Sequence, residues 1–328
     1  MTVGSYSKAL FPIFFTLMLR AQPTVLLQPN DAVHLAEISK LFQSHYAEHG
    51  CPSAEAALER STGDILLRMH DGCLDGVSTF AGDYRTSART GEVRDFTGRL
   101  IITKGDPSLV KLWDEIGSSL LSEKEASCLV AQTSSIQEWL RDGVHFRAAI
   151  STVDEAFSVD VIPLVSKPAA SVRLLRFRVD PREYRVVKGR FKDEETSDKV
   201  VAVQRLLQSA KGPIEISSSD VLEGVKRLPE VTKWLRASPC RDVRLETDLE
   251  GITYYTVDLF RWCQNEPSSQ SEAGFGVDKR TGAILAPQGI GITSSKLPDI
   301  VSKLEELRLR KEAARNRLSE LCETAKGR

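Results

Sequence analysis

The sequence predicts an α+β fold in which antiparallel β-sheet modules follow one another along the chain and each module is closed by a helix. Two observations lead to this expectation. Short β-prone runs are separated by turn residues, as in antiparallel hairpins. A unit of glycine, short strand, hydroxyl residue and amphipathic helix also occurs three times. The 328 residues, 41% of them hydrophobic, are enough for two or three compact units.

Residues 1–30 have the composition of a targeting presequence. Lys8 and Arg20 are basic, the first acid is Asp31, and residues 9–19 are mostly apolar. Basic and hydroxyl residues without acids are typical of a mitochondrial presequence. The apolar run leaves a secretory signal open, and an ordinary buried N-terminal segment is the third interpretation. We predict a mitochondrial location, with a cytoplasmic or nuclear one as the alternative.

The repeated strand–helix unit divides the rest of the chain into three modules. Its strands begin at Gly98, Gly212 and Gly289, and each is followed by apolar residues three and four apart. We therefore expect an α+β module over 31–125, a second over 126–240 that carries a basic strand region, and a third over 241–328 that ends in a helical tail.

Strands and helices are expected at particular places within these modules. Helices are predicted over residues 31–60, 198–210 and 297–323. Asp278 to Gly282 reads as the turn of a hairpin. The predicted strands span 65–69, 77–85, 92–96, 145–150, 157–165, 172–179, 243–246, 252–259, 274–277 and 283–285.

The third module resembles the sheet-plus-helix unit of the Whirly, Pur-alpha and transcriptional coactivator p15 proteins. The resemblance rests on the alternating strand Tyr254–Trp262, the segment Gly289–Thr293 and the helix from Leu297 to Leu307. It covers about 85 residues, and the two earlier modules share it only through the repeat. It implies curved antiparallel sheets that bind single-stranded DNA or RNA and that pair within or between chains.

The strongest indication of nucleic-acid binding lies in residues 172–192. This segment contains eight basic residues, two acidic residues and three interleaved aromatic residues. Cations neutralise phosphates and exposed aromatic rings stack on bases. Arg176 and Arg178 share one face of the predicted strand, and Phe177 lies on the other. A solvated face or a contact with the acidic half of the chain is the alternative. The candidate nucleic-acid-binding residues are Arg173, Arg176, Arg178, Arg182, Tyr184, Arg185, Lys188, Arg190, Lys192, Arg244, Arg261, Lys279 and Arg280.

The net charge of −1 hides a segregation of charge along the chain. Residues 31–160 carry a net charge of −9, whereas residues 172–211 carry +5. A uniformly basic protein is excluded, but a local surface for a polyanion is allowed. The acidic half becomes a candidate surface for protein contacts.

Cysteine and histidine provide little chemistry. His45, His49, Cys51, His70 and Cys73 lie close in sequence but match no standard zinc spacing, so we predict no metal site. Cys128, Cys240, Cys263 and Cys322 are expected to be packed thiols in a reducing compartment. We also predict no cofactor and no membrane contact.

No sequence motif of an enzyme is present. We therefore predict a non-enzymatic protein that binds single-stranded RNA or DNA within an assembly for RNA processing or transcription. Its expected partners are nucleic acid and other protein subunits or further copies of itself. The alternative is a protein scaffold that does not bind nucleic acid directly.

Overall fold

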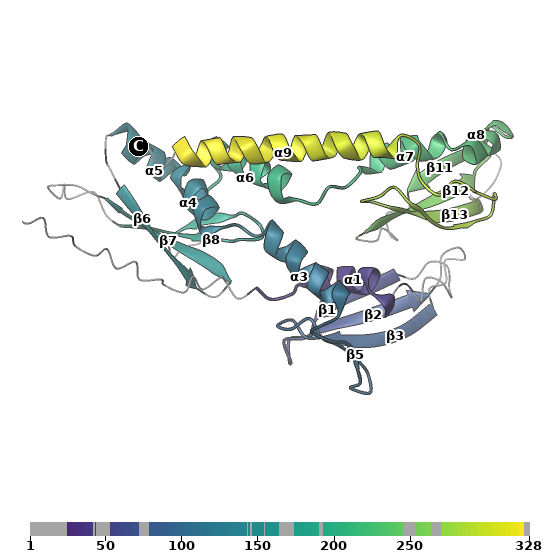
Figure 1. The fold of residues 1–328 in the computed structure, drawn as a ribbon, viewed down its shortest axis with the longest axis horizontal. Coiled ribbons are helices and arrows are strands. Elements are labelled where there is room, and N and C mark those ends of the chain that lie inside the picture. Colours follow the sequence, from purple (N-terminus) through teal and green to yellow (C-terminus); the bar gives the residue numbers. More distant parts are fainter. Residues whose placement is uncertain are drawn as a thin grey trace, which may run out of the picture.

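The computed structural model describes residues 25–41, 43, 53–71, 79–142, 144, 146–153, 155–163, 174–189, 193–245, 253–263 and 270–324. These residues form three antiparallel sheets, and consecutive strands are neighbours in every sheet. Helices pack on the sheets and one long helix runs along the molecule (Figure 1). The predicted α+β fold with tandem antiparallel sheets is confirmed at this level.

The first sheet is a five-stranded meander covered by two helices. Helices α1 (Pro29–Ile38) and α3 (Pro107–Ser119) pack on it through a core that includes Leu35, Ile65 and Leu112. Its strands are β1 (Ser53–Leu58), β2 (Ile65–Asp71), β3 (Thr79–Thr86), β4 (Val93–Asp95) and β5 (Leu100–Ile102).

The expected helix over 31–60 is wrong over residues 53–58, which form β1. This segment is rich in good helix formers, but each of its residues pairs with a residue of β2. The pairing packs Ala54 and Ala56 against the core beside Leu67. Tertiary packing therefore overrides local helix propensity here.

Along the chain, the second sheet is preceded by a pair of helices and followed by a single helix. Helices α4 (Glu123–Ala131) and α5 (Ser134–Arg141) precede the sheet, and α6 (Asp198–Lys211) follows it. The core on the covered face includes Phe157, Phe177 and Leu207. The strands are β6 (Phe146–Val153), β7 (Ala156–Pro163), β8 (Leu175–Val179), β9 (Val186–Lys188) and β10 (Asp193–Glu194).

The third sheet has the same arrangement with four strands. Helices α7 (Ser218–Lys226) and α8 (Pro229–Arg236) precede it, and α9 (Ile300–Thr324) follows it. The predicted hairpin turn is confirmed, since Gly282 adopts a φ of 65° between β13 and β14. The strands are β11 (Arg241–Leu245), β12 (Tyr254–Arg261), β13 (Gln270–Asp278) and β14 (Ile284–Gln288).

The expected repeat of a strand followed by a helix is present only in its first copy, as β5 and α3. In the other two copies, residues 213–217 and 289–293 lie outside any strand. Their backbone amides bond elsewhere: Ile216 donates to the carbonyl of Lys279, and Thr293 donates to the carboxylate of Glu230. These segments are therefore connections held by separate hydrogen bonds and not strands in a ladder.

A different unit recurs before the second and third sheets. Helices α4 and α7 both begin with a capping box, formed by Ser122 with Glu125 and by Ser217 with Asp220. Trp139 and Trp234 follow at the same distance from the capping serine, on α5 and α8 respectively. The repeated element is thus a helix pair, a meander and a closing helix.

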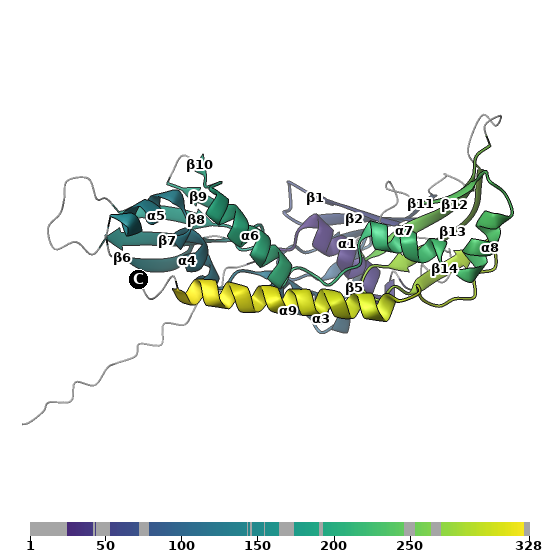
Figure 2. The same cartoon turned by 90° about the horizontal axis from the view of Figure 1, so that it is seen from above.

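Helix α9 joins the third module to the second. Ile300 at its start belongs to the core of the third sheet, whereas Ala314, Leu318 and Cys322 belong to the core of the second. With 25 residues it spans about 37 Å. Figures 1 and 2 show α9 running from the third sheet to the second, with α6 beside its second half.

The hydrophobic cores place two limits of the modules at other residues than the sequence predicts. Val231 and Trp234 share a core with Phe275, so α7 and α8 pack on the third sheet although they precede residue 240. At the other end, Leu27 is 2% exposed and Gln28 caps α1, so residues 25–30 belong to the first module. The predicted presequence otherwise falls on residues 1–24, outside the described residues.

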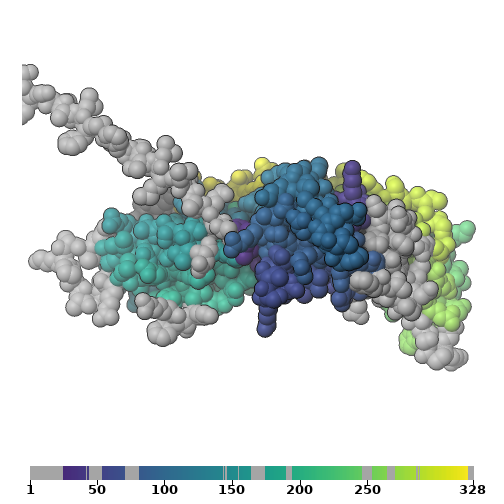
Figure 3. Space-filling model, turned by 90° about the horizontal axis from the view of Figure 1, so that it is seen from below, coloured from purple at the N-terminus to yellow at the C-terminus, as the bar shows by residue number. Residues whose placement is uncertain are grey.

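The first module contacts both of the others. Arg182 beside the second sheet pairs with Asp31 of α1 at 2.8 Å. Tyr254 of the third sheet packs against Met69 of β2. Seen from below, the first module covers the middle of the molecule (Figure 3). Among the described helices, none combines the length and the apolar content needed to cross a bilayer.

Candidate nucleic-acid interface

The second sheet has one covered face and one open face, and β8 divides its side chains between them. Phe177 and Val179 are fully buried in the core, whereas Arg176 and Arg178 are exposed on the opposite face. This is the alternation expected from the sequence. It places Phe177 in the core and removes it from the candidate surface.

Arg176 is already bound to a carboxylate of the same sheet. Its Nε and an Nη donate to the two carboxylate oxygens of Asp160 on β7, at 2.6 and 2.9 Å. The two residues are cross-strand partners in the β7–β8 ladder. The hydrogen bond from Arg176 lowers the pKa of Asp160, so the pair is fully charged at neutral pH.

Two further arginines share this open face. Arg178 lies opposite Ser158, and Arg147 of β6 lies opposite Ile162. Both are exposed, and within the described part of the chain neither forms an ion pair. The pattern of residues in 145–150 could have indicated Arg147, because alternation along the β6–β7 hairpin puts it on the face of Asp160.

The other predicted residues near β8 point toward the protein interior or pair locally. Arg182 donates to Asp31 and to the carbonyl of Leu26, both in or beside the first module. Tyr184 is 5% exposed and its hydroxyl donates to the carbonyl of Ser119. These two side chains hold the first and second modules together.

Lys188 and Arg185 also have partners nearby. Lys188 donates to the hydroxyl of Ser135 on α5, on the covered side of the sheet. Arg185 pairs with Glu183 at 2.6 Å on the surface. The predicted residues Arg173, Arg190 and Lys192 lie outside the described residues.

The predicted residues of the third module form no common surface. Arg244 pairs with Asp258 at 3.0 Å, and Arg261 pairs with Glu272 at 3.6 Å. Lys279 is 9% exposed and its ammonium lies 4.7 Å from the ring centre of Tyr255. Each of these cations is compensated within the sheet that carries it.

Arg280 lies where the first and third modules meet. It pairs with Glu115 of α3 at 2.9 Å and with Glu215 at 3.5 Å. Burial alone would raise the pKa of Glu115, but hydrogen bonds from His34 and Arg280 lower it below its ordinary value. The predicted set of cations is therefore divided between one open sheet face and several contacts inside the fold.

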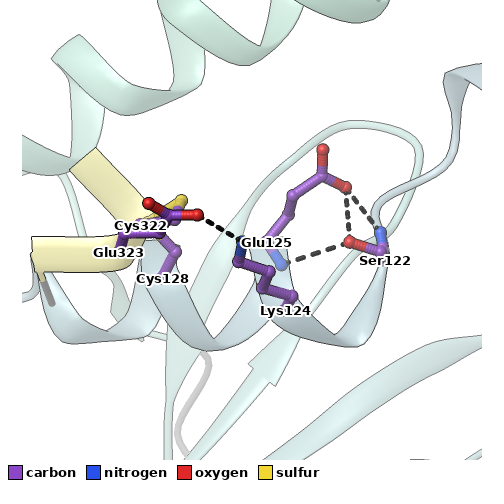
Figure 4. The surroundings of a disulfide bond; sticks show 6 residues. All are labelled: Ser122, Lys124, Glu125, Cys128, Cys322 and Glu323. Carbon is purple, nitrogen blue, oxygen red and sulfur yellow. Dashed lines mark hydrogen bonds and ion pairs between the residues drawn. A yellow bond between two sulfur atoms is a disulfide. The ribbon is translucent and has the colours of Figure 1, made fainter. Parts of the chain in front are cut away.

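The structure contains disulfides that the sequence analysis missed. Cys128 of α4 bonds Cys322 of α9, with their Cα atoms 5.2 Å apart (Figure 4). Cys240 bonds Cys263 with a Cα separation of 4.9 Å. Both separations suit a disulfide. The expectation of isolated packed thiols is thus wrong for these four cysteines.

The hairpin pattern of the sequence could have indicated the Cys240–Cys263 bond. Cys240 and Cys263 flank the first pair of the β11–β12 ladder, Arg241 with Arg261, so the hairpin register brings them together. Nothing in the sequence relates Cys128 to Cys322, because only the docking of α9 on the second module joins them.

The possible metal ligands are mostly outside the described residues, namely His45, His49, Cys51 and Cys73. His70 lies 3.9 Å from Glu55 across β1 and β2. Within the described ranges, no group of three or more metal-ligating side chains converges.

Three comparisons with known proteins give no match. No family model matches the chain, and neither the search of the curated proteins nor that of the solved structures gives a match.

Proposed function

We propose that this protein is a non-enzymatic scaffold that binds other proteins through three modules held in a fixed arrangement. The observation that carries the proposal is that predicted phosphate-binding cations are already paired with carboxylates of the protein itself. Arg176, Arg182 and Arg280 each bind a carboxylate at 2.9 Å or less.

The pairing matters because of how proteins bind nucleic acid. Binding gains free energy when free cations replace the counterions condensed on phosphates. A cation that already neutralises a carboxylate must lose that partner first, so it contributes little. Arg182 and Arg280 would in addition have to leave the contacts between modules.

The acidic groups support a structural role in the same way. The pKa of Asp220 is lowered because hydrogen bonds from Ser217 and Lys303 outweigh the effect of burial, and the pKa of Asp160 is lowered by Arg176. A general acid needs a pKa near the working pH, which is the opposite direction. These carboxylates therefore act as fixed charges in ion pairs and caps.

The disulfides support an oxidising compartment. Disulfides persist in secreted proteins and in the secretory pathway and are rare where thiols are kept reduced. The Cys128–Cys322 and Cys240–Cys263 bonds therefore favour the secretory interpretation of the apolar run in residues 9–19 over the mitochondrial one. Such a compartment also favours protein partners over single-stranded nucleic acid.

The test is to purify the tagged full chain under non-reducing conditions after cross-linking, with and without nuclease. A scaffold retains its protein partners after nuclease treatment. Loss of all partners on digestion would contradict the proposal and favour nucleic acid as the bridge. Thiol titration of the denatured protein shows at the same time whether the cysteines are oxidised.

Single-stranded nucleic acid on the open face of the second sheet is the second candidate. Arg147, Arg176 and Arg178 share that face, and the Whirly-like and Pur-alpha-like resemblance of the third module points to the same activity. A filter-binding titration across salt concentrations tests it. Under this candidate the Arg147→Glu/Arg178→Glu variant loses a salt-dependent affinity that an Arg89→Glu/Lys104→Glu variant, altered on the first module, retains.

A further inference from the structure

A continuous groove runs between α6 and α9 on the second module. Two adjoining hollows of about 450 and 560 Å³ share Leu206, Ser209 and Arg317 in their walls. One extends past Leu307 to the connection after α6, and the other extends past Leu321 to the end of α4. Figure 2 shows α6 converging on α9, with the C-terminal end of α6 nearest the long helix.

The floor of the groove is apolar. Leu206, Leu307 and Leu321 are partly exposed in it, and Val203 and Ala314 lie buried beneath. The stretch from Leu307 to Leu321 is about 21 Å long, which equals about 14 residues of a helix lying alongside. An apolar trough of this length between two helices matches the stripe of one amphipathic helix.

The rims of the groove are basic. Lys199 and Arg205 of α6 line one hollow together with Arg317 of α9, and Arg310 and Arg317 of α9 line the other. Glu215 is the one acid among the described lining residues, and it pairs with Arg280. Arg310 pairs with Glu306 of its own helix. Within the described ranges, Arg205 and Arg317 form no ion pair, in contrast to the cations at the module contacts.

We propose that this groove binds an acidic amphipathic helix of a partner protein. Leucine-type side chains of the partner would cover the apolar floor, and carboxylates flanking that stripe would pair with Arg205 and Arg317. The inference rests on the proposed scaffold function and assigns it a site and a partner chemistry. A concave apolar trough between two helices fits the apolar face of a third helix.

The experiment uses the full-length oxidised protein and a series of stapled helical peptides of about 14 residues. All peptides carry the same leucine stripe, and their flanks are acidic, neutral or basic. Fluorescence anisotropy should show that affinity rises from basic to acidic flanks and falls as salt is added. Binding that ignores the charge of the flanks, or no binding by the acidic peptide, would overturn the inference.

Three variants locate the binding. Arg205→Glu/Arg317→Glu should lower the affinity for the acidic peptide by roughly tenfold or more and raise the affinity for the basic peptide. Ala202→Trp places an indole in the groove from an exposed position and should block both. Arg89→Glu/Lys104→Glu changes the net charge equally on the first module and should change nothing. Equal weakening by the last variant would show a general charge effect and contradict the site.

Further experiments distinguish a partner helix from other occupants of the groove. Co-sedimentation with phosphatidylserine vesicles or concentration-dependent dimerisation, either of them abolished by Ala202→Trp, would assign the groove to lipid or to a second copy and overturn the inference. If the peptides fail while cross-linked partners of the full chain survive nuclease and the Ala202→Trp change, the scaffold function stands and this site for it is wrong.

Discussion

Cys322, near the end of α9, is bonded to Cys128 in α4, which lies 194 positions earlier in the chain. The bond fixes the far end of the helix that starts in the core of the third module. The second and third modules are therefore joined twice, once by packing along α9 and once covalently.

Removing this disulfide should cost more stability than removing the other one. A chain-entropy model assigns about 5 kcal/mol to closing a loop of 194 residues and about 3 kcal/mol to one of 23 residues. Guanidinium unfolding of Cys128→Ser/Cys322→Ser and Cys240→Ser/Cys263→Ser measures both. Unchanged stability of the first variant, or of the wild type after reduction, would show that the bond does not form.

Gly282 should tolerate no side chain. It adopts a φ of 65°, and a Cβ there would lie 2.3 Å from Cγ1 of Ile300 at the start of α9. Gly282→Ala should lose about 2 kcal/mol or more. Gly63 is the matched control, since it has a φ of 73° with no atom within 4 Å of the added Cβ. Gly63→Ala should lose only about 1 kcal/mol, from backbone strain alone. Equal losses would contradict the close approach to α9.

Tyr184 should make the protein sensitive to alkali. Burial raises the pKa of its phenol to about 12, with a smaller contribution from Glu125. Because the folded state keeps the proton longer than the unfolded state, the stabilisation is complete below pH 10.0 and is lost as the pH rises toward 12. Tyr184→Phe should flatten this part of the stability curve, and ultraviolet absorbance of the phenolate follows the titration. A phenol that titrates near its ordinary pKa would contradict the burial.

Arg280 should stabilise the contact between the first and third modules more at neutral pH than at low pH. The pKa of Glu115 lies below its ordinary value of 4.5, because hydrogen bonds from His34 and Arg280 outweigh the effect of burial. Its stabilisation is therefore present above pH 4.5 and is lost as the pH falls through the lowered pKa. Arg280→Ala should cost about 1–2 kcal/mol at neutral pH, and less further stability should be lost on acidification, because the pKa of Glu115 moves back up without Arg280.

The surface pair of Arg185 and Glu183 provides the control for that experiment. Both side chains are about half exposed, so Arg185→Ala should cost less than about 0.5 kcal/mol. Chemical unfolding across the acid range compares the two variants. A similar small effect of both would show that Arg280 is not a structural contact.

Glu230 should order the connection before α9. Its carboxylate accepts hydrogen bonds from the amide and hydroxyl of Thr293 and from the hydroxyl of Ser294. The hydrogen bond from the Thr293 hydroxyl is the main reason that its pKa falls to about 2. Glu230→Ala should speed amide exchange at Thr293, whereas exchange in β12 should not change. Unchanged exchange at Thr293 would show that the contact is not formed in solution.

Local patterns predicted most of the strands, and they failed where tertiary contacts compete with propensity. The alternation around Phe177 correctly separated a core face from an arginine face, because a strand exposes its residues in strict alternation. The same kind of reasoning assigned a helix to residues 53–58, where pairing with β2 decides the structure. The partners of the candidate site residues could not be predicted for a related reason: spacing shows that Arg182 and Arg280 are basic but not that Asp31 and Glu115 lie beside them.

By itself the sequence determined the α+β class, the hairpins and the faces of the strands, because these depend on residues only a few positions apart. The packing of the folded chain sets which helices cover which sheet, and it shows that α9 spans two modules and that Cys128 meets Cys322. The packing also determines which cations form ion pairs with carboxylates and which remain unpaired, within the described residues, on the rims of the groove beside α9. The disulfide and the ion pairs that Arg182 and Arg280 form with the first module join residues separated by 151 to 194 positions, and such contacts leave no periodicity in a single sequence.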